Sequence, residues 1–186
     1  SYITINISSP NTEGLRDFHE EKLLSELLTK LLELKKNNKI KCPIALKLSP
    51  DIEEKEINNI NEMVLKFKID GIILTNTTNQ NREALIDINK HENGGLSGPI
   101  LHKLSLKFIK IFYKLNKGNL PIIGVGGVDS GKSAFEKITS GATAIQLYTG
   151  MVYKGPGIIK NIKQELIEIL KKEKIKNIQQ AVGINS

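Results

Sequence analysis

Four short polar tracts carry the side chains of this sequence that could do chemistry. They are Asn6-Ile7-Ser8-Ser9-Pro10-Asn11-Thr12, Lys47-Leu48-Ser49-Pro50-Asp51, Thr75-Asn76-Thr77-Thr78 and Gly124-Val125-Gly126-Gly127. Each tract follows a strand-like apolar run and precedes a helix-like segment, so all four should meet at the carboxyl edge of a parallel sheet. Hydroxyls, a lysine, amides and a glycine turn at one edge predict a site for a polar planar substrate beside a phosphorylated cofactor.

The glycine tract is typical of a phosphate-binding loop. Glycines let backbone N–H groups approach an anion, and the N-terminus of the following helix adds its dipole. The next strand ends in Tyr148-Thr149-Gly150, ahead of another helix start near residues 155–157. In α/β barrels the loops after the last two strands commonly form a phosphate site, so the two loops together favour this interpretation. The alternative is that both are tight turns required only for packing.

Lys47 lies between apolar neighbours inside a strand-like run. An unpaired ammonium in a protein core is costly, so this lysine should face an anionic or electron-rich group. The alternative is an edge-strand lysine whose ammonium reaches solvent. Asn6, Asn11, Asn76 and Thr77 add amides and hydroxyls that suit a ligand with alternating carbonyl and N–H groups. Asn and Thr are also ordinary turn residues, so each of these four is weak evidence alone.

No other catalytic or metal-binding pattern is evident. Ser8 or Ser9 could act as a nucleophile or base, but no nearby His or acid completes a triad. His19, His91 and His102 fall in loops or helix starts without metal-ligand spacing. We therefore interpret these three histidines as surface residues and predict no metal site.

The composition is that of a globular protein with one domain. The chain has 186 residues, of which 39% are hydrophobic and 25% are charged. No stretch approaches the roughly 18 uncharged apolar residues that a membrane span needs. The net charge of +7 comes from scattered lysines, and only Arg16 and Arg82 are arginines. Because nucleic-acid readout depends heavily on arginine, we predict no nucleic-acid partner.

Strand-like and helix-like segments alternate along the chain. The predicted strands are residues 2–8, 43–48, 71–75, 121–125 and 144–148, and the predicted helices are residues 20–36, 53–67, 104–115, 131–140 and 157–172. The strand runs are rich in Ile, Val and Leu, as expected for strands buried on both faces. The alternation predicts an α/β fold with a parallel sheet. Five βα units would form the last five units of a TIM (β/α)8 barrel, and a five-stranded doubly wound sheet is the competing architecture.

Three features of the ends and loops add expectations. Residues 2–7 already alternate as a strand does, which favours a fragment of a longer protein. Residues 11–19 form a polar connection long enough to act as a flap. The connection over residues 79–99 runs about twenty residues, a length usually found in functional or disordered loops.

As a set, these motifs resemble the dihydroorotate dehydrogenase family. The resemblance extends from Tyr2 to about Gly183 in the family's order, and it also includes Asp70-Gly71-Ile72-Ile73-Leu74, Gly94-Gly95-Leu96-Ser97-Gly98 and Gln146-Leu147-Tyr148. It implies an FMN enzyme on a TIM barrel that oxidises dihydroorotate to orotate in pyrimidine synthesis. Residues 1–186 would then be the C-terminal portion of a single FMN-binding barrel domain. Since the family's first barrel strands would be missing, we expect the chain alone to be inactive.

The residue at position 9 selects a class within that family. Members with soluble acceptors carry Cys in the Ser-Pro-Asn tract, whereas the membrane-associated, quinone-linked class carries Ser, as here at Ser9. The resemblance implies that Ser9 takes the C5 proton of dihydroorotate while a hydride passes from C6 to the flavin. A ubiquinone-type quinone would be the final acceptor. The protein would lie peripherally on the bacterial cytoplasmic membrane or the mitochondrial inner membrane, through an N-terminal segment that this chain lacks.

The same matching assigns binding roles to individual residues. The positions that match orotate contacts are Asn6, Asn11, Asn76 and Thr77, and Asn6 also faces the flavin. The positions that match flavin contacts are Lys47 beside the ring, Thr75, Gly98, Gly127, Tyr148 and Thr149, with the last three around the phosphate. Residues 12–18 match the flap over the substrate. Glu13 stands where Pro is common and Thr149 where Ser is usual.

Two other functions stay open. One is a related FMN barrel that acts on another pyrimidine, against which the amides of Asn6, Asn11 and Asn76 argue together with Ser9. The other is a non-catalytic half-barrel that binds phosphorylated ligands, in which Ser9 and Lys47 could be replaced without consequence.

Overall fold

Five parallel strands form one sheet in the order of the sequence. The computed structural model describes the backbone of residues 1–186 and all side chains except those of Glu54 and Ala84. The strands are β1 (Ile3–Asn6), β2 (Ile44–Leu48), β3 (Gly71–Leu74), β4 (Ile122–Gly124) and β5 (Ala144–Ile145). Each pairs with its neighbour in sequence, so the order is β1-β2-β3-β4-β5. A doubly wound sheet reverses its order at an internal switch point, so the unbroken order excludes that alternative and matches the barrel prediction.

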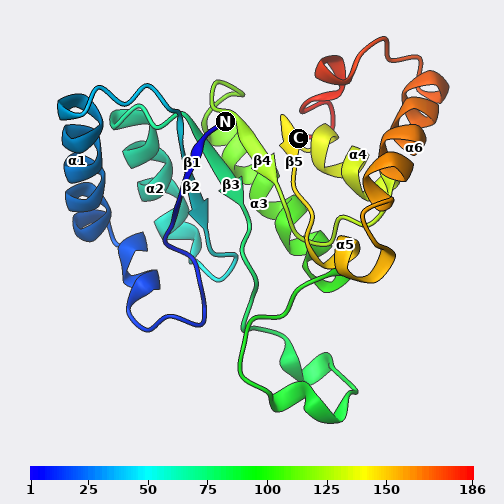
Figure 1. The fold of residues 1–186 in the computed structure, drawn as a ribbon, viewed down its shortest axis with the longest axis horizontal. Helices are drawn as coiled ribbons and strands as arrows, with labels where there is room; N and C mark the ends of the chain where they lie inside the picture. Colours follow the sequence, from blue (N-terminus) through cyan, green and yellow to red (C-terminus); the bar gives the residue numbers. More distant parts are fainter.

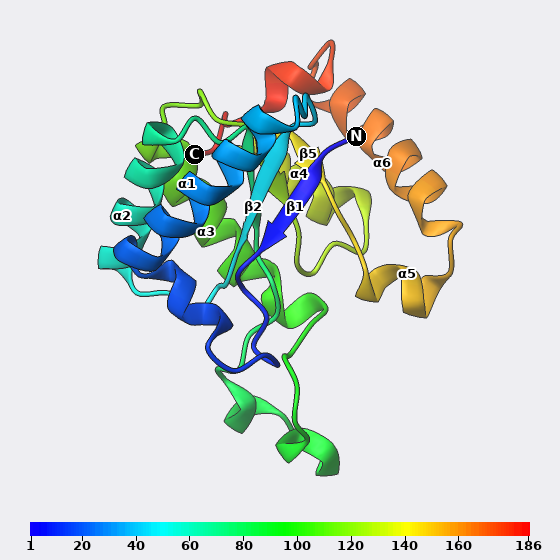
Figure 2. The ribbon, with the colours of Figure 1, turned by 60° about the vertical axis from the view of Figure 1, so that its left-hand side comes forward.

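Helices follow one another around the outside of this sheet (Figures 1 and 2). They are α1 (Glu21–Asn37), α2 (Glu54–Lys66), α3 (His102–Leu115), α4 (Gly131–Thr139), α5 (Thr149–Lys154) and α6 (Ile158–Lys172). The predicted helices match five of these within two residues at every end. The sequence did not indicate α5, because Tyr148-Thr149-Gly150 was interpreted as a loop. In the described part of the chain, no helix has the length and apolar character that crossing a membrane requires.

The sheet curls strongly, as a barrel segment must. Tyr2 precedes β1 and Gln146 follows β5, and these are the two edge strands. Gln146 Nε2 nevertheless donates a hydrogen bond of 2.5 Å to the Tyr2 hydroxyl. In a flat sheet, four inter-strand spacings would separate the edges by about 19 Å. The hydrogen bond therefore requires a sheet bent well toward closure, with both side chains on its concave face.

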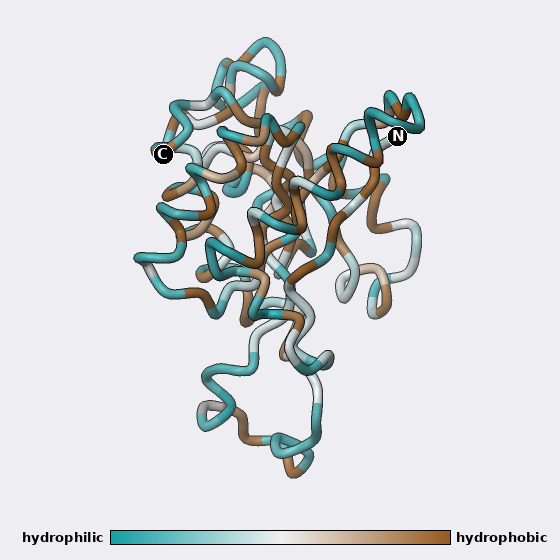
Figure 3. The backbone as a smooth tube through the Cα atoms, turned by 90° about the vertical axis from the view of Figure 1, so that its left-hand side faces the viewer, coloured by the Kyte–Doolittle hydropathy of each residue, from teal (hydrophilic) through white to brown (hydrophobic). Residues whose placement is uncertain are grey.

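The core lies between the convex face of the sheet and the helices. Leu46, Leu48, Ile72 and Leu74 are fully buried and pack with apolar side chains from α1, α2 and α3. In Figure 3 the hydrophobic segments gather on the strands and on the helix faces turned toward them. The expectation that all strands are buried on both faces is wrong for the edge strands β1 and β5, where Ile3 is 43% exposed and Ala144 is also exposed.

Residues 79–97 leave the sheet as a separate excursion, seen at the lower end of Figure 1. They contain the 3-10 helices η2 (Arg82–Ala84) and η3 (Ile88–His91). A two-way bridge closes the base of the excursion, with Leu96 N 2.7 Å from Thr78 O and Thr78 N 3.2 Å from Leu96 O. Inside it, the Arg82 guanidinium donates to the carbonyls of Lys90, Glu92 and Gly94. The long loop predicted here is therefore internally organised.

Close packing between α4 and α6 yields a prediction about stability. A Cβ added at Gly131 would overlap the Cβ of Glu165 and lie 3.0 Å from the amide of Leu166. Gly131→Ala should lower the free energy of unfolding by about 1–3 kcal/mol, because overpacking forces the helices apart. Gly157→Ala is the matched control, since no atom lies within 4 Å of the added Cβ and φ is −60°. Urea unfolding should show a loss for the first variant only, and equal stabilities would contradict the packing argument.

Candidate functional site

A cavity of about 490 Å³ opens at the carboxyl ends of β2 to β5. It lies where parallel α/β sheets place their ligand sites. Eight residues predicted from the sequence line it: Lys47, Thr75, Asn76, Thr77, Gly98, Gly127, Tyr148 and Thr149. The structure therefore brings together side chains from four strand ends, separated by up to about a hundred residues.

Backbone geometry prepares one end of this cavity for an anion. Gly126 and Gly127 have φ values of 103° and 71°, a region that disfavours other residues. A Cβ at Gly127 would lie 2.8 Å from His102 Cβ and 3.0 Å from Gly98 O. In the described chain, the amides of Gly126 and Gly127 donate to no backbone carbonyl. They are therefore free to bind an acceptor such as a phosphate oxygen.

Two polar side chains in the cavity also lack partners. Thr75 is 2% exposed, and its hydroxyl has no hydrogen-bond partner among the described residues. Lys47 is half-buried and belongs to none of the ion pairs in the part of the chain that the structure describes. Burial lowers the pKa of Lys47. An orphaned hydroxyl, a partly desolvated ammonium and free glycine amides fit a flavin with its phosphate, so these residues suit FMN.

A buried serine joins two of the predicted amides. Ser8 is fully buried, and its hydroxyl donates to Asn6 Oδ1 at 2.7 Å and accepts from Asn76 Nδ2 at 2.9 Å. Asn76 Oδ1 in turn accepts from the amide of Thr77 at 2.8 Å. Ser8 thus fixes both carboxamides, a role that the sequence analysis missed. The alternation of β1 was a usable signal, because Asn6 and Ser8 lie two residues apart and share one face.

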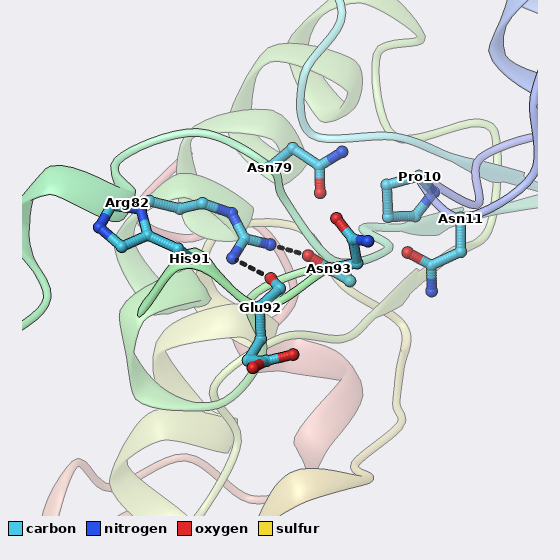
Figure 4. Close-up of a pocket in the computed structure, with 8 residues that line it drawn as sticks. Pro10, Asn11, Asn79, Arg82, His91, Glu92 and Asn93 are labelled. Carbon is cyan, nitrogen blue, oxygen red and sulfur yellow. Dashed lines mark hydrogen bonds between the residues drawn. The ribbon is translucent and has the colours of Figure 1, made fainter. Parts of the chain in front are cut away.

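The remaining predicted residues lie next to the cavity. Ser9 Oγ accepts a hydrogen bond of 3.2 Å from the Asn11 amide, and Ser9 lines neither of the two large cavities on this side. Asn11 lines a second cavity of about 540 Å³ together with Pro10 and Arg82 (Figure 4). Gly95 separates the two spaces, since a Cβ there would overlap Thr77 and lie 2.9 Å from Pro10 Cγ.

The predicted flap is anchored at its C-terminal half. The structure places a 3-10 helix, η1 (Leu15–His19), where an irregular loop was expected. Arg16 forms an ion pair of 3.1 Å with Asp51, and Phe18 packs against the core. Asp51 also accepts from the Asn79 amide at 2.9 Å and from the Thr78 hydroxyl. Within the flap, residues 12–14 and Asp17 are exposed, whereas Leu15, Arg16 and Phe18 are partly buried.

His19 corrects the expectation that the histidines are surface residues. It is 3% exposed, its Nδ1 lies 2.7 Å from the Arg16 carbonyl, and the Ser49 amide donates to its Nε2 at 3.3 Å. This pattern requires a neutral ring with the proton on Nδ1, and burial lowers the pKa of His19. His102 is partly buried and lies 2.6 Å from Glu136, while His91 is exposed as expected. The described residues contain no group of side chains able to hold a metal ion.

Comparison with known proteins identifies similar sequences and folds. A family model described as dihydroorotate dehydrogenase matches residues 1–170. Relatives named dihydroorotate dehydrogenase (quinone) include one from Trichodesmium erythraeum, 44% identical over 98% of this chain and 50% of its own length. Another, from Shewanella baltica, is 48% identical over 87% of this chain and 49% of its own length. The chain therefore spans about half the length of these curated relatives.

Solved structures of dihydroorotate dehydrogenases have a similar fold. The ligand-free crystal structure of DHODH from Eimeria tenella matches with a TM-score of 0.92 and 36% identity, over 99% of this chain and 55% of that one. The same protein in complex with ferulenol matches with a TM-score of 0.91 and 35% identity, over 99% and 54% of the two chains.

The contacts of His19 predict how stability depends on pH. Because the folded pKa is lowered, the unfolded state binds more protons once the pH falls below about 6.5. The free energy of unfolding should then fall with pH, by at most about 1.4 kcal/mol per pH unit from this group, until the lowered folded pKa is reached. His19→Gln should weaken this dependence, since an amide can donate to Arg16 O and accept from Ser49 N at any pH.

Urea unfolding between pH 5 and 8 would test this, with the exposed His91→Gln as the control that keeps the wild-type slope. Parallel losses of stability in wild type and His19→Gln would show that the buried ring is not the acid-sensitive group.

Proposed function

The chain belongs to the dihydroorotate dehydrogenase family, and we propose that it forms the ligand-binding half of a quinone-linked dihydroorotate dehydrogenase in pyrimidine synthesis. One observation carries this proposal: Lys47, the unpartnered Thr75 hydroxyl and the Gly126-Gly127 turn line the same cavity. The amides of Asn6 and Asn76, joined through Ser8, lie beside it. A packing turn alone would need neither an unpartnered buried hydroxyl nor a half-buried lysine.

FMN, when bound, supplies a two-electron acceptor for the hydride that leaves dihydroorotate. We propose that Gly127, Tyr148 and Thr149 hold its phosphate, with Gly98 close by, since Thr149 hydrogen-bonds Ser97 at 3.0 Å and lines the same cavity. The unpaired hydroxyl of Thr75 would form a hydrogen bond with the flavin. Lys47 offers a cation that is worth most in a partly desolvated site, where it stabilises negative charge.

Carboxamides orient the substrate in this proposal. A dihydroorotate ring presents alternating carbonyl and N–H groups, and a carboxamide can both donate to and accept from such an edge. Asn6 and Asn76 are pre-oriented by Ser8, which lowers the entropy lost when the substrate binds. Thr77, which contacts Gly95, and Asn11, which lines the second cavity, complete the set.

Ser9 is the proposed base that removes the C5 proton. A serine hydroxyl is a weak base at its ordinary pKa, so it needs a hydrogen-bonded route by which its own proton can leave. The flap over residues 12–18, anchored by the Arg16–Asp51 ion pair and by Phe18, would cover the substrate and keep water out. Quinone as final acceptor and a peripheral position on a membrane are proposed from the relatives, which are named quinone enzymes.

Replacement of Ser9 tests the proposed chemistry. In the full-length protein that contains this chain, Ser9→Ala should slow dihydroorotate oxidation by about 10²–10⁴-fold while FMN stays bound, because only the proton acceptor is lost. The rate of flavin bleaching after anaerobic mixing with dihydroorotate measures this step directly. Recovery of the flavin absorbance on adding ubiquinone tests the second half-reaction.

Ser8→Ala is the matched control at the neighbouring position. It should raise the dihydroorotate concentration needed for half-maximal bleaching, because Asn6 and Asn76 lose their shared partner. Rapid bleaching in Ser9→Ala would refute the assignment of the base. Bound flavin that ignores dihydroorotate would favour a barrel that acts on another pyrimidine, and a protein without flavin would favour a non-catalytic half-barrel.

A further inference from the structure

Lys137 is a buried lysine that the proposed reaction does not use. It lies on α4 and is 0% exposed. Its side chain passes beneath β4, and its Cδ would lie 3.2 Å from a Cβ added at Gly124. Its Nζ donates to Ser105 Oγ at 2.8 Å. Within the described chain it belongs to no ion pair. A buried ammonium with one neutral partner lacks the counter-charge that such groups normally have.

A chain of hydrogen bonds leads from this ammonium to the cavity. Ser105 Oγ donates to the Val125 carbonyl at 2.6 Å, and the same carbonyl accepts from the Thr75 amide at 3.2 Å. In a planar trans peptide the C=O and the following N–H point in opposite directions. The Gly126 N–H therefore points away from Ser105. Gly126 lines the cavity, and its amide donates to no backbone carbonyl in the described chain.

We propose that Lys137 is a positioning residue for the cofactor phosphate. It acts through the hydrogen bonds that link it to Ser105 and Ser105 to the Val125–Gly126 peptide, and it places a buried positive charge behind the glycine turn. The inference rests on the proposed function, since it requires that this cavity binds FMN. Lys137 does not touch the ligand. It orients and polarises the peptide whose N–H is free, and its charge supplies part of the potential that an anion experiences there.

The proposal implies that cofactor binding is coupled to proton uptake. Burial lowers the pKa of Lys137 to about 7, and the neighbouring Glu136 carboxylate opposes this. A phosphate dianion behind the Val125–Gly126 peptide favours the ammonium and raises that pKa. Near neutral pH, Lys137 must therefore take up a proton in a fraction of the protein molecules when they bind FMN.

Several titratable groups on the elements packed around Lys137 have contacts of their own, although the Glu136 charge also acts on Lys137. On α4 and α3, Glu136 lies 2.6 Å from His102, and Lys110 donates to the Asn185 carbonyl. Tyr113 of α3 packs against Gly141, and Glu165 of α6 accepts from the Gly131 amide. Neither β5 nor the 3-10 helix η5 (Ile178–Ala181) carries a titratable side chain.

Calorimetric titration of FMN into the flavin-free, full-length protein tests the coupling. Performed at pH 7.5 in two buffers of different ionisation enthalpy, it should show uptake of about 0.5 proton per FMN if the pKa rises by one unit. The Kd for FMN should rise about fivefold between pH 7 and pH 9 for the same reason. The phosphate is already largely a dianion in this range. Riboflavin, which lacks the phosphate, should show neither effect.

Variants separate the charge from packing. Lys137→Met removes the charge and keeps the length of the side chain, so it should weaken FMN binding at pH 7 and abolish both proton uptake and the rise in Kd. Lys132→Met, at an exposed position of the same helix, should behave as wild type. Ser105→Ala should weaken FMN binding and leave riboflavin binding unchanged.

The outcomes are distinguishable. Equal pH dependence in wild type and Lys137→Met would overturn the inference and leave the proposed function intact. Wild type that binds no FMN would overturn the proposed function and the inference with it. If Lys137→Met does not fold, proton uptake by the wild-type protein decides alone, because equal uptake with FMN and riboflavin contradicts a phosphate-linked charge.

Discussion

Backbone hydrogen bonds between strands continue past the ends of the strands, and the site depends on this continuation. The Val125 amide donates to Leu74 O at 2.6 Å, and the Thr75 amide donates back to Val125 O. Between the ends of β3 and β2, the Asn76 amide donates to Leu48 O at 2.9 Å. These bonds hold the first residues of each loop in the register of the sheet. The sheet therefore holds the side chains at these positions in place, as a precise ligand site requires.

Asp51 is the second organising group, and it connects the flap to the excursion. Its side chain is 7% exposed, so its negative charge would be costly without partners. Those partners come from three segments: Arg16 on η1, the Thr78 hydroxyl after β3, and the Asn79 amide at the start of the excursion. The flap and the excursion therefore share one carboxylate. A displacement of either segment changes the hydrogen bonds available to the other.

Local sequence patterns predicted the parts of this structure that depend on local physics. Apolar runs of Ile, Val and Leu located all five strands, and the residues singled out at the ends of those runs and in the long loop include eight of the twenty that line the cavity. Patterns could not show what tertiary packing decides. His19 lies in a polar connection and becomes buried because the fold brings η1 to Ser49, the residue after β2. Lys137 follows Glu136 and has the pattern of a solvated charge pair, yet α3 and α6 both cover α4.

The bridge between Thr78 and Leu96 has a consequence for how this region can vary among related proteins. It ties the two ends of the excursion together before the chain returns to Gly98 and the cavity. The number of residues between these two ends can therefore change without moving the ends themselves. Closure of a flexible loop costs only about 0.6 kcal/mol more for each doubling of its length. Insertions or deletions near the exposed Ile86 and Ile88 can therefore accumulate in evolution, and a tag or reporter domain can be inserted there, without shifting the register of the strands below.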